Sequence, residues 1–331
     1  MLENNYFERV NMSNPLKIVY MQKTFYEVSQ DWSKAKRPIV KYSTMCAYLL
    51  ILQKHLDPYF GSMKDITEDV VQQFVMNKLS SGHSKKSVRD MVAVLKSVVK
   101  HGRKQKMFTY DDWDIKYPTD TSDHRLPTLS FKNQQVLVRH IVQAPNTKNI
   151  GILLALYTGM RIGEVCALEW QDIDFNQKTI TIRKTIGRVY DCETKSTQKI
   201  ISTPKTKNSY REIPISNMLL KCLKVIRKEA KGTFVVGTSS TAQEPRIYRD
   251  YFNRLLKKLE IPKMVFHGLR HTFATRCIES QCDYKTVSAI LGHSNIATTL
   301  NLYVHPNLNQ KKKCIDTVSY THLRAHETRS N

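Results

Sequence analysis

The segment 111–128, DDWDIKYPTDTSDHRLPT, constrains the fold more than any other part of the chain because it separates two stretches of helical pattern. It is rich in Asp, Thr and Pro, which favour turns and loops over regular structure. The chain has 331 residues, enough for two domains of ordinary size. We therefore expect one domain over 20–110, a linker over 111–128 and a second domain over 129–310. We expect 1–19 and 311–331 to be an N-terminal remnant and a C-terminal tail.

The stretch before the linker carries helical patterns. Apolar residues recur at helical spacing over 42–56 and over 66–81. We expect Ser43 or Thr44 to cap the first of these helices and Thr67 to cap the second, whose early acidic residues also suit the helix dipole. The pattern predicts an all-α helical bundle.

The segment 84–106 predicts a long amphipathic helix. Its expected buried stripe consists of Val88, Met91, Val92, Leu95, Val98 and Val99. Basic residues cover the remainder, and the expected DNA contacts among them are Lys85, Lys86, Arg89, Lys96 and Arg103. Charged helix positions usually form a solvated face, so the DNA interpretation depends on the charge of the whole chain.

The stretch after the linker mixes helical and strand patterns. KTITIRKT (178–185) alternates apolar and polar residues and predicts a strand, and 199–215 predicts a strand, a polar turn and a strand. Trp170 and Phe175 are expected in the core. Helices are expected over 149–159, 160–170, 216–230, 246–258, 267–280, 284–291 and 295–303. The predicted fold is mainly α with a small antiparallel β-sheet, an α+β domain preceded by the helical bundle.

The net charge points to a polyanionic partner. Lys and Arg number 52 against 29 acidic residues, which gives a net charge of +23. Double-stranded DNA is the expected partner, since nucleic acid is the commonest polyanion that such proteins bind. The competing interpretation is an anionic membrane surface. The chain has no apolar run of membrane-spanning length and no strongly amphipathic basic terminal helix, so no membrane partner is expected.

The cysteines favour a reducing compartment. There are seven, scattered along the chain, with no C-x-x-C pair, and no signal peptide opens the sequence. We expect free thiols and a cytoplasmic protein, associated with the nucleoid when bound to DNA. A zinc site that uses Cys277, Cys282 and nearby histidines is the alternative, but these residues lack a standard ligand spacing, so no metal is expected.

Two short segments each carry an arginine at an expected helix start. In HGLRHTFATR (267–276), His267 shares one helix face with Arg270 and His271, three and four residues on. Arg161 begins another expected helix, with Glu164 one turn later to hold it in place. Helix starts attract anions, and two forked guanidinium groups could clamp the oxygens of one phosphate.

Further candidates complete a phosphate site. Lys205 lies in the polar turn TPKTKNS, where Lys207 competes for the same role, and His293 follows the expected C-cap glycine of a helix. Tyr303 lies on the last expected helix. No carboxylate cluster is present to hold Mg²⁺, so we expect metal-free and cofactor-free phosphoryl transfer through a covalent intermediate on tyrosine.

The order of these motifs resembles the tyrosine recombinases of phage and conjugative-element integrases. The motifs are R-x-x-E at 161–164, the turn lysine at 205, H-G-L-R-H-T-F-A-T at 267–275, L-G-H-S at 291–294 and the tyrosine ten residues past that histidine. The resemblance covers roughly 130–310 in motif detail, and 20–110 looks like the core-binding domain of that family by pattern. The segment 1–19 is short for the arm-site-binding domain that many such integrases carry.

The resemblance implies a site-specific recombinase that integrates or excises a mobile element. Four protomers would exchange strands through a Holliday junction, with an accessory DNA-bending or directionality factor as a further partner. The implied roles are Tyr303 as nucleophile, Arg161, Arg270 and His293 as ligands of the phosphate oxygens, Lys205 as acid for the leaving 5′-oxygen, His267 as proton carrier at the tyrosine, and Glu164 as the residue that positions Arg161.

Two alternatives remain open from the sequence. A type IB topoisomerase shares the chemistry but acts as a monomer without paired sites, and a non-catalytic DNA-binding protein could keep the scaffold. Near the motifs, His271 is expected to be structural, Arg276 to face water, and His305 to be a bystander. The basic tail KKKC (311–314) either is solvated or docks on a neighbouring protomer. The segment 319–331 is expected to be disordered or non-native.

Overall fold

The computed structural model describes residues 23–105, 112–119, 127–202, 210–237, 241–300, 312 and 315–316. These residues form two compact units. One holds the described residues up to 119 together with Val189–Gln198, and the other holds those from 127 to Arg188 and from Lys199 onward. The predictions for the segment 1–19, for Lys205, Lys207, Tyr303 and His305, and for 319–331 lie outside the described residues.

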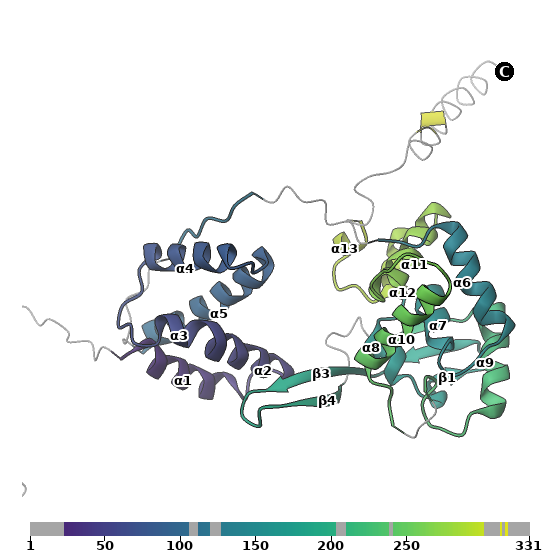
Figure 1. Cartoon of the computed structure of the whole chain (residues 1–331), viewed down its shortest axis with the longest axis horizontal. Coiled ribbons are helices and arrows are strands. Elements are labelled where there is room, and N and C mark those ends of the chain that lie inside the picture. Colours follow the sequence, from purple (N-terminus) through teal and green to yellow (C-terminus); the bar gives the residue numbers. More distant parts are fainter. Residues whose placement is uncertain are drawn as a thin grey trace, which may run out of the picture. The chain divides into compact units, whose positions relative to one another are not determined.

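The first unit is a helical bundle, as the sequence predicts (Figure 1). Its elements are α1 (Phe25–Lys36), α2 (Tyr42–Ile51), a π-helical turn η1 (Leu52–Leu56), α3 (Asp57–Phe60), α4 (Glu68–Ser80) and α5 (Lys85–Lys104). Helix α1 is not predicted by the apolar pattern, although a capping box marks its start. Thr24 Oγ1 accepts from the Glu27 N–H at 3.3 Å, and Glu27 Oε2 accepts from the Thr24 N–H at 2.7 Å.

Helix α5 organises the core of this unit. It contacts α1, α2 and α4, and its predicted stripe is buried, with Val88, Leu95, Val98 and Val99 fully so. The expected N-cap of α2 is wrong. Extended backbone at Lys41 starts the helix at Tyr42, which places Ser43 and Thr44 inside its first turn.

The segment 112–118 lies along α4 and α5. The Trp113 side chain is buried, and Lys96 Nζ donates to the Trp113 carbonyl at 2.8 Å. Gln72 pairs with the backbone of Lys116, donating from Nε2 at 3.0 Å and accepting at Oε1 at 2.9 Å. The first half of the predicted linker is therefore held as an extended strap on the helical unit.

The second unit surrounds a small sheet with helices, which matches the predicted fold class. Its helices are α6 (Phe131–Gln143), α7 (Ile150–Thr158), α8 (Ile162–Ala167), a 3₁₀ turn η2 (Trp170–Asp172), α9 (Asn217–Glu229), α10 (Pro245–Lys258), α11 (His267–Glu279), α12 (Tyr284–Leu291) and α13 (Ala297–Leu300). The sheet consists of β1 (Ile173–Asp174), β2 (Thr179–Ile182) and β5 (Arg211–Pro214). Strands β3 (Thr185–Asp191) and β4 (Ser196–Ser202) form a separate two-stranded sheet, and their residues within Val189–Gln198 belong to the first unit. None of the helices among the described residues is both long enough and apolar enough to span a membrane.

The two strands predicted in 199–215 are present as the end of β4 and as β5, and they belong to different sheets. Strand β5 pairs antiparallel with β2, with Ile213 opposite Ile180, and β4 pairs with β3. The sequence does not predict strand β3, because most of its side chains are at least partly exposed and do not alternate between apolar and polar. The helix expected over 160–170 is shorter, because the backbone is extended at Arg161 and again at Leu168.

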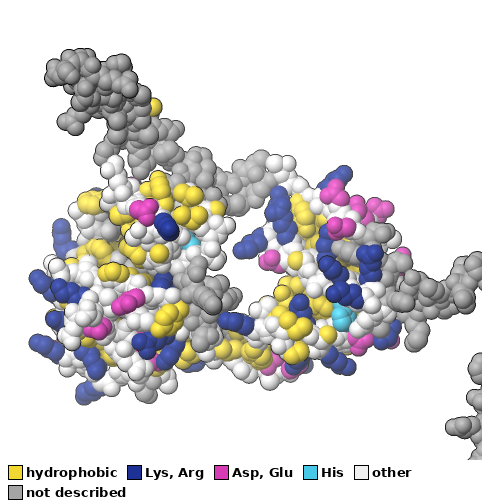
Figure 2. All heavy atoms as spheres, turned by 180° about the vertical axis from the view of Figure 1, so that it is seen from behind, with side chains coloured by type: hydrophobic (Ala, Val, Ile, Leu, Met, Phe, Trp, Pro, Cys, Tyr) yellow, Lys and Arg dark blue, Asp and Glu magenta, His cyan; other side chains and the backbone are white. Residues whose placement is uncertain are grey.

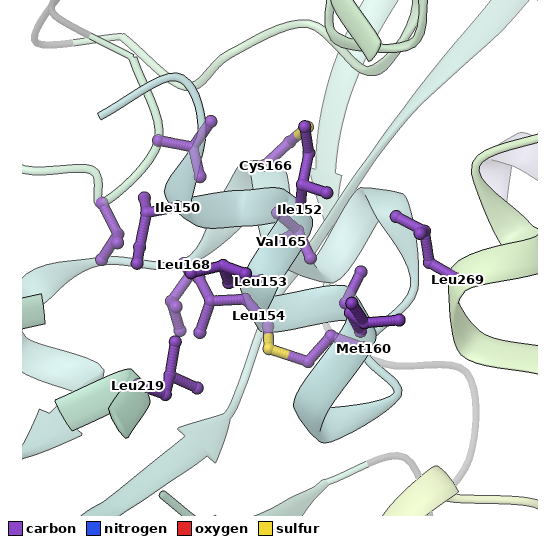
Figure 3. Close-up of a cluster of buried hydrophobic side chains, with 14 of the residues drawn as sticks. Ile150, Ile152, Leu153, Leu154, Met160, Val165, Cys166, Leu168, Leu219 and Leu269 are labelled. Carbon is purple, nitrogen blue, oxygen red and sulfur yellow. The ribbon is translucent and has the colours of Figure 1, made fainter. Parts of the chain in front are cut away.

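The core of the second unit is built around α7. This helix contacts α6, α8, α9 and α11 (Figure 1), and nearly all of its side chains are buried. Figure 3 shows Ile152, Leu153 and Leu154 of α7 among Val165 and Leu269 of neighbouring helices. Trp170 is buried and Phe175 packs at the edge of this cluster, as predicted. A helix that is apolar on all sides must be enclosed, and this fixes the position of the turn that follows it.

Gly159 ends α7 in the left-handed conformation, with φ of 67°. A Cβ at this position would lie 2.5 Å from Leu291 Cδ2 and 2.8 Å from Phe273 Cδ1. The glycine therefore permits both the reversal of the chain and the close approach of α11 and α12.

We expect Gly159→Ala to lower the free energy of unfolding by about 2–4 kcal/mol, because it adds left-handed strain and overpacks the contact with Leu291. Urea denaturation followed by circular dichroism measures the change. Gly187→Ala in β3 is the control, since a Cβ there meets nothing within 4 Å. Equal destabilisation by the two substitutions would contradict this account of Gly159.

Candidate active site

Arg161 lies at the start of α8, two residues after the α7 cap. Its backbone is extended, and its N–H donates to Glu164 Oε2 at 2.9 Å while its Nη1 donates to Glu164 Oε1 at 2.9 Å. The Glu164 side chain is only 4% exposed, whereas that of Arg161 is 36% exposed. Glu164 thus anchors the arginine at both ends and leaves part of the guanidinium open to solvent.

Arg270 lies in the first turn of α11 and is buried. Its Nη1 donates to the Gly159 carbonyl at 2.7 Å, and its Nη2 donates to the Leu291 carbonyl at 2.7 Å. Both acceptors are at helix C-termini, where carbonyl groups lack intrahelical partners. Arg270 therefore joins the ends of α7 and α12 and is fixed in orientation by them.

His293 follows Gly292, which ends α12 with φ of 66°. His293 Nδ1 lies 2.8 Å from the hydroxyl of the buried Thr299, and Arg161 Nη2 donates to the Gly292 carbonyl at 3.3 Å. The turn after α12 thus carries a histidine into the same neighbourhood as both arginines.

The histidines of the site resist protonation. The His267 side chain is exposed in part, but the partial burial of its ring, together with the charges of His271 and Arg270, lowers its pKa to about 4. Burial and the charges of Arg270 and Arg161 lower the pKa of His293 to about 4. Both rings are therefore neutral at pH 7 and can accept as well as donate a proton.

Arg270 itself sits in an electropositive environment. Burial and the neighbouring Arg161 charge lower the pKa of its guanidinium to about 9, so the group stays charged at neutral pH. Burial alone would raise the pKa of Glu164, but the hydrogen bonds and charges of Arg211 and Arg161 lower it overall. The site holds more positive than negative charge and is suited to an anion.

Arg211 is the site residue that the sequence reasoning missed. It begins β5 and forms a buried ion pair with Glu164. Its residue type gives no warning, but its position could have, because Arg211 and Ile213 face the same side of an alternating strand. An arginine on the inward face of such a strand requires a buried partner.

The predictions for His271 and Arg276, two further residues of α11, have different outcomes. His271 packs edge-on to His267 with ring centroids 4.8 Å apart, which fits the expected structural role. The prediction that Arg276 faces water is wrong. Its side chain donates to Gln134 Oε1 at 3.2 Å and to the Leu129 carbonyl at 2.9 Å, because α11 packs beside α6 at this level.

The described residues show no group of three or more potential metal ligands. Cys277 and Cys282, from which a zinc site would be built, are free thiols. The alternative of a zinc site therefore gains no support from the part of the chain that the structure describes.

The basic residues of α5 have mixed surroundings. Lys85 Nζ donates to the Pro118 carbonyl at 2.5 Å, and the Arg89 guanidinium lies 4.9 Å from the centroid of the Tyr117 ring. Lys96 also contacts the strap. The side chains of Lys86, Arg89 and Arg103 are exposed. Lys and Arg side chains are spread over the surface of both units in Figure 2. DNA contact by α5 stays a prediction, with Lys86, Arg89 and Arg103 as its exposed members.

Comparison with known proteins places this geometry in a family. Residues 129–310 match the phage integrase family, and residues 24–80 match the N-terminal SAM-like domain of phage integrases. The first match covers more than half of the chain, so this chain belongs to the phage integrase family, the tyrosine recombinases.

Individual relatives agree with this assignment. The chain is 35% identical to a XerC-like tyrosine recombinase of Caldanaerobacter subterraneus subsp. tengcongensis over 50% of its own length, and it spans only about half (48%) of that relative. It is 25% identical to the ICEBs1 integrase of Bacillus subtilis over 80% of this chain and 74% of the relative. It is 26% identical to the transposase of transposon Tn916 from Enterococcus faecalis over 82% of this chain and 71% of that relative.

Solved structures share the fold at lower identity. The integrase of transposon Tn1549, bound to transposon right-end DNA, superposes with a TM-score of 0.71 and 22% identity over 88% of this chain and 99% of that one. A lambda integrase tetramer bound to a Holliday junction gives a TM-score of 0.62 and 17% identity over 85% of this chain and 77% of the lambda integrase chain.

The depressed histidine pKa values lead to a prediction for stability. An unfolded histidine has a pKa of about 6.5, so between that pH and about 4 the unfolded chain binds protons that the folded site excludes. Stability from these sites is complete above pH about 6.5 and is lost as the pH falls toward about 4. We expect His267→Asn to lose less stability than wild type as the pH falls from about 6.5 to about 4, measured by thermal unfolding at a series of pH values. His140→Asn in α6 is the control. If wild type, His267→Asn and His140→Asn all lose stability equally over this pH range, the lowered pKa of His267 is contradicted.

Proposed function

We propose that this chain is a site-specific DNA recombinase that cuts and rejoins DNA through a 3′-phosphotyrosine intermediate. The observation that carries the proposal is the convergence of Arg161 and Arg270 with the neutral rings of His267 and His293 in one electropositive site. The family match supports the same reaction.

Tyr303 is the proposed nucleophile. Its phenolic oxygen attacks the scissile phosphorus, the bond from phosphorus to the 5′-oxygen breaks, and the tyrosine proton passes to neutral His267. Lys205 donates a proton to the departing 5′-oxygen. The phosphotyrosine diester keeps the energy of the broken diester, so a 5′-hydroxyl from a second strand reverses the step without a nucleotide cofactor.

The two arginines and His293 stabilise the charge that develops in this reaction. The pentavalent phosphorus carries additional negative charge on its non-bridging oxygens, and preorganised donors lower the energy of that state. Arg270 is held by two carbonyl groups and Arg161 by Glu164, so neither guanidinium must be ordered when the phosphate arrives. Such preorganisation favours the transition state over the ground state.

The proposed substrate is double-stranded DNA at the junctions of a mobile element, which the enzyme integrates or excises. The relatives of this chain include a protein named as the ICEBs1 integrase and one named as the transposase from transposon Tn916, and these names support the proposal. A tetramer on a Holliday junction is known for lambda integrase, and we propose the same assembly here. An accessory DNA-bending or directionality factor is a further proposed partner. We propose that the protein is associated with the nucleoid when it is bound to DNA.

We expect the protein to form a covalent adduct with a nicked duplex that spans an element junction, and Tyr303→Phe to form none, because the phenol supplies the attacking oxygen. Denaturing gels measure the adduct, and circular dichroism checks that the variant folds. An adduct that persists in Tyr303→Phe would reject the nucleophile. Relaxation of a plasmid without junction sites, with no recombinant from paired sites, would favour topoisomerase activity instead.

We expect DNA affinity to fall steeply with salt, because each neutralised phosphate releases counterions. Removing one phosphate contact reduces the slope of log affinity against log salt by about 1. Lys86→Gln and Arg103→Gln should each show this reduction in fluorescence anisotropy titrations. Lys228→Gln at the end of α9 is the control. A slope that neither α5 variant changes would remove α5 from the DNA interface.

A further inference from the structure

Arg211 and Glu164 form an ion pair inside the second unit. Arg211 Nη1 lies 3.2 Å from Glu164 Oε1, Arg211 Nη2 lies 2.9 Å from Glu164 Oε2, and the two side chains are 6% and 4% exposed. A forked pair of this kind is strongly oriented, and removing one partner leaves the other as an uncompensated buried charge.

The same carboxylate serves Arg161. Oxygen Oε1 of Glu164 accepts from the guanidinium groups of both Arg161 and Arg211, and Oε2 accepts from the Arg161 N–H and from Arg211. One negative charge is thus shared between two positive charges. Arg161 is held in place without being neutralised, and it keeps a surplus of positive charge for an incoming phosphate.

Arg211 also contacts the end of α12. Three successive carbonyl groups there accept from three arginines that come from three different elements. The pairs are Ile290 with Arg211 Nε at 2.5 Å, Leu291 with Arg270 Nη2 at 2.7 Å, and Gly292 with Arg161 Nη2 at 3.3 Å. The last carbonyls of a helix lack intrahelical partners and carry partial negative charge, so they attract cations. His293 follows directly, and its position depends on this contact.

We propose that Arg211 is a positioning residue of the recombination site: it shares the Glu164 carboxylate so that Arg161, Glu164 and Arg211 together keep a net positive charge toward the scissile phosphate, and it fixes the end of α12 that carries His293. The inference rests on the proposed recombinase function. It assigns no contact between Arg211 and DNA.

The effect on charge distinguishes this role from simple support of the fold. In Arg211→Met, Glu164 keeps Arg161 as its one guanidinium partner, and the pair becomes electrically neutral. In the double variant Glu164→Gln/Arg211→Met, the amide cannot neutralise Arg161. If Arg211 acts through charge, adding Glu164→Gln to Arg211→Met should restore part of the rate of adduct formation that Arg211→Met removes. If Arg211 only supports packing, the two substitutions should each lower that rate further.

The test uses the full chain and the nicked junction duplex, with rates of adduct formation measured by single-turnover quenching. We expect Arg211→Met to slow adduct formation about 100-fold, with DNA affinity changed less than about twofold, because the loss falls on the transition state. The double variant should form the adduct about tenfold faster than Arg211→Met. Arg211→Lys keeps the charge without the fork and should lie between wild type and Arg211→Met. Arg183→Met is the control, since Arg183 pairs with Asp172 in the same unit at 3.7 Å.

The outcomes separate the two proposals. A wild-type chain that forms no adduct overturns the recombinase function and this inference with it. A wild-type chain that forms the adduct, together with Arg211→Met at the wild-type rate, overturns only the role of Arg211. A double variant that is no faster than Arg211→Met overturns the charge argument. If circular dichroism shows that Arg211→Met does not fold, Arg211→Lys is the test. A wild-type rate of adduct formation in Arg211→Lys would overturn the role of the forked guanidinium.

Discussion

The C-terminal end of helix α12 is the feature on which the site depends. Its final carbonyls have no partners within the helix, and three of them accept hydrogen bonds from guanidinium groups. The glycine cap is what exposes these carbonyls to their partners, since left-handed backbone at Gly292 ends the helix abruptly. The pairs are Ile290 with Arg211, Leu291 with Arg270 and Gly292 with Arg161.

This arrangement gathers positive charge where burial would otherwise disfavour it. Arg270 and Arg211 are both buried, and a buried charge is tolerated only when it is paired or fully hydrogen-bonded. Glu164 and the helix ends supply that compensation, but one carboxylate cannot balance three guanidinium groups. Burial, together with this remaining positive charge, keeps the nearby His267 and His293 neutral, so the site that suits a phosphate also holds proton acceptors.

Local patterns predicted much of the fold because they depend on neighbours in sequence. The apolar stripe of α5, the enclosed helix α7 and the glycine caps at Gly159 and Gly292 all follow from periodicity and backbone preference. The errors come from elements with weak periodicity. Most side chains of β3 are at least partly exposed, so its pairing with β4 could not be deduced.

The sequence by itself determined the two-part organisation, the basic character and the order of the arginine, histidine and tyrosine motifs, because spacing along one helix or across one turn sets which residues are neighbours. Tertiary structure decided which of these positive residues share a site. Arg276 belongs to the packing of α11 on α6, whereas Arg211, more than 40 residues from its partner Glu164, belongs to the site. No local pattern encodes such a pair, since it exists only when β5, α8 and the end of α12 pack together.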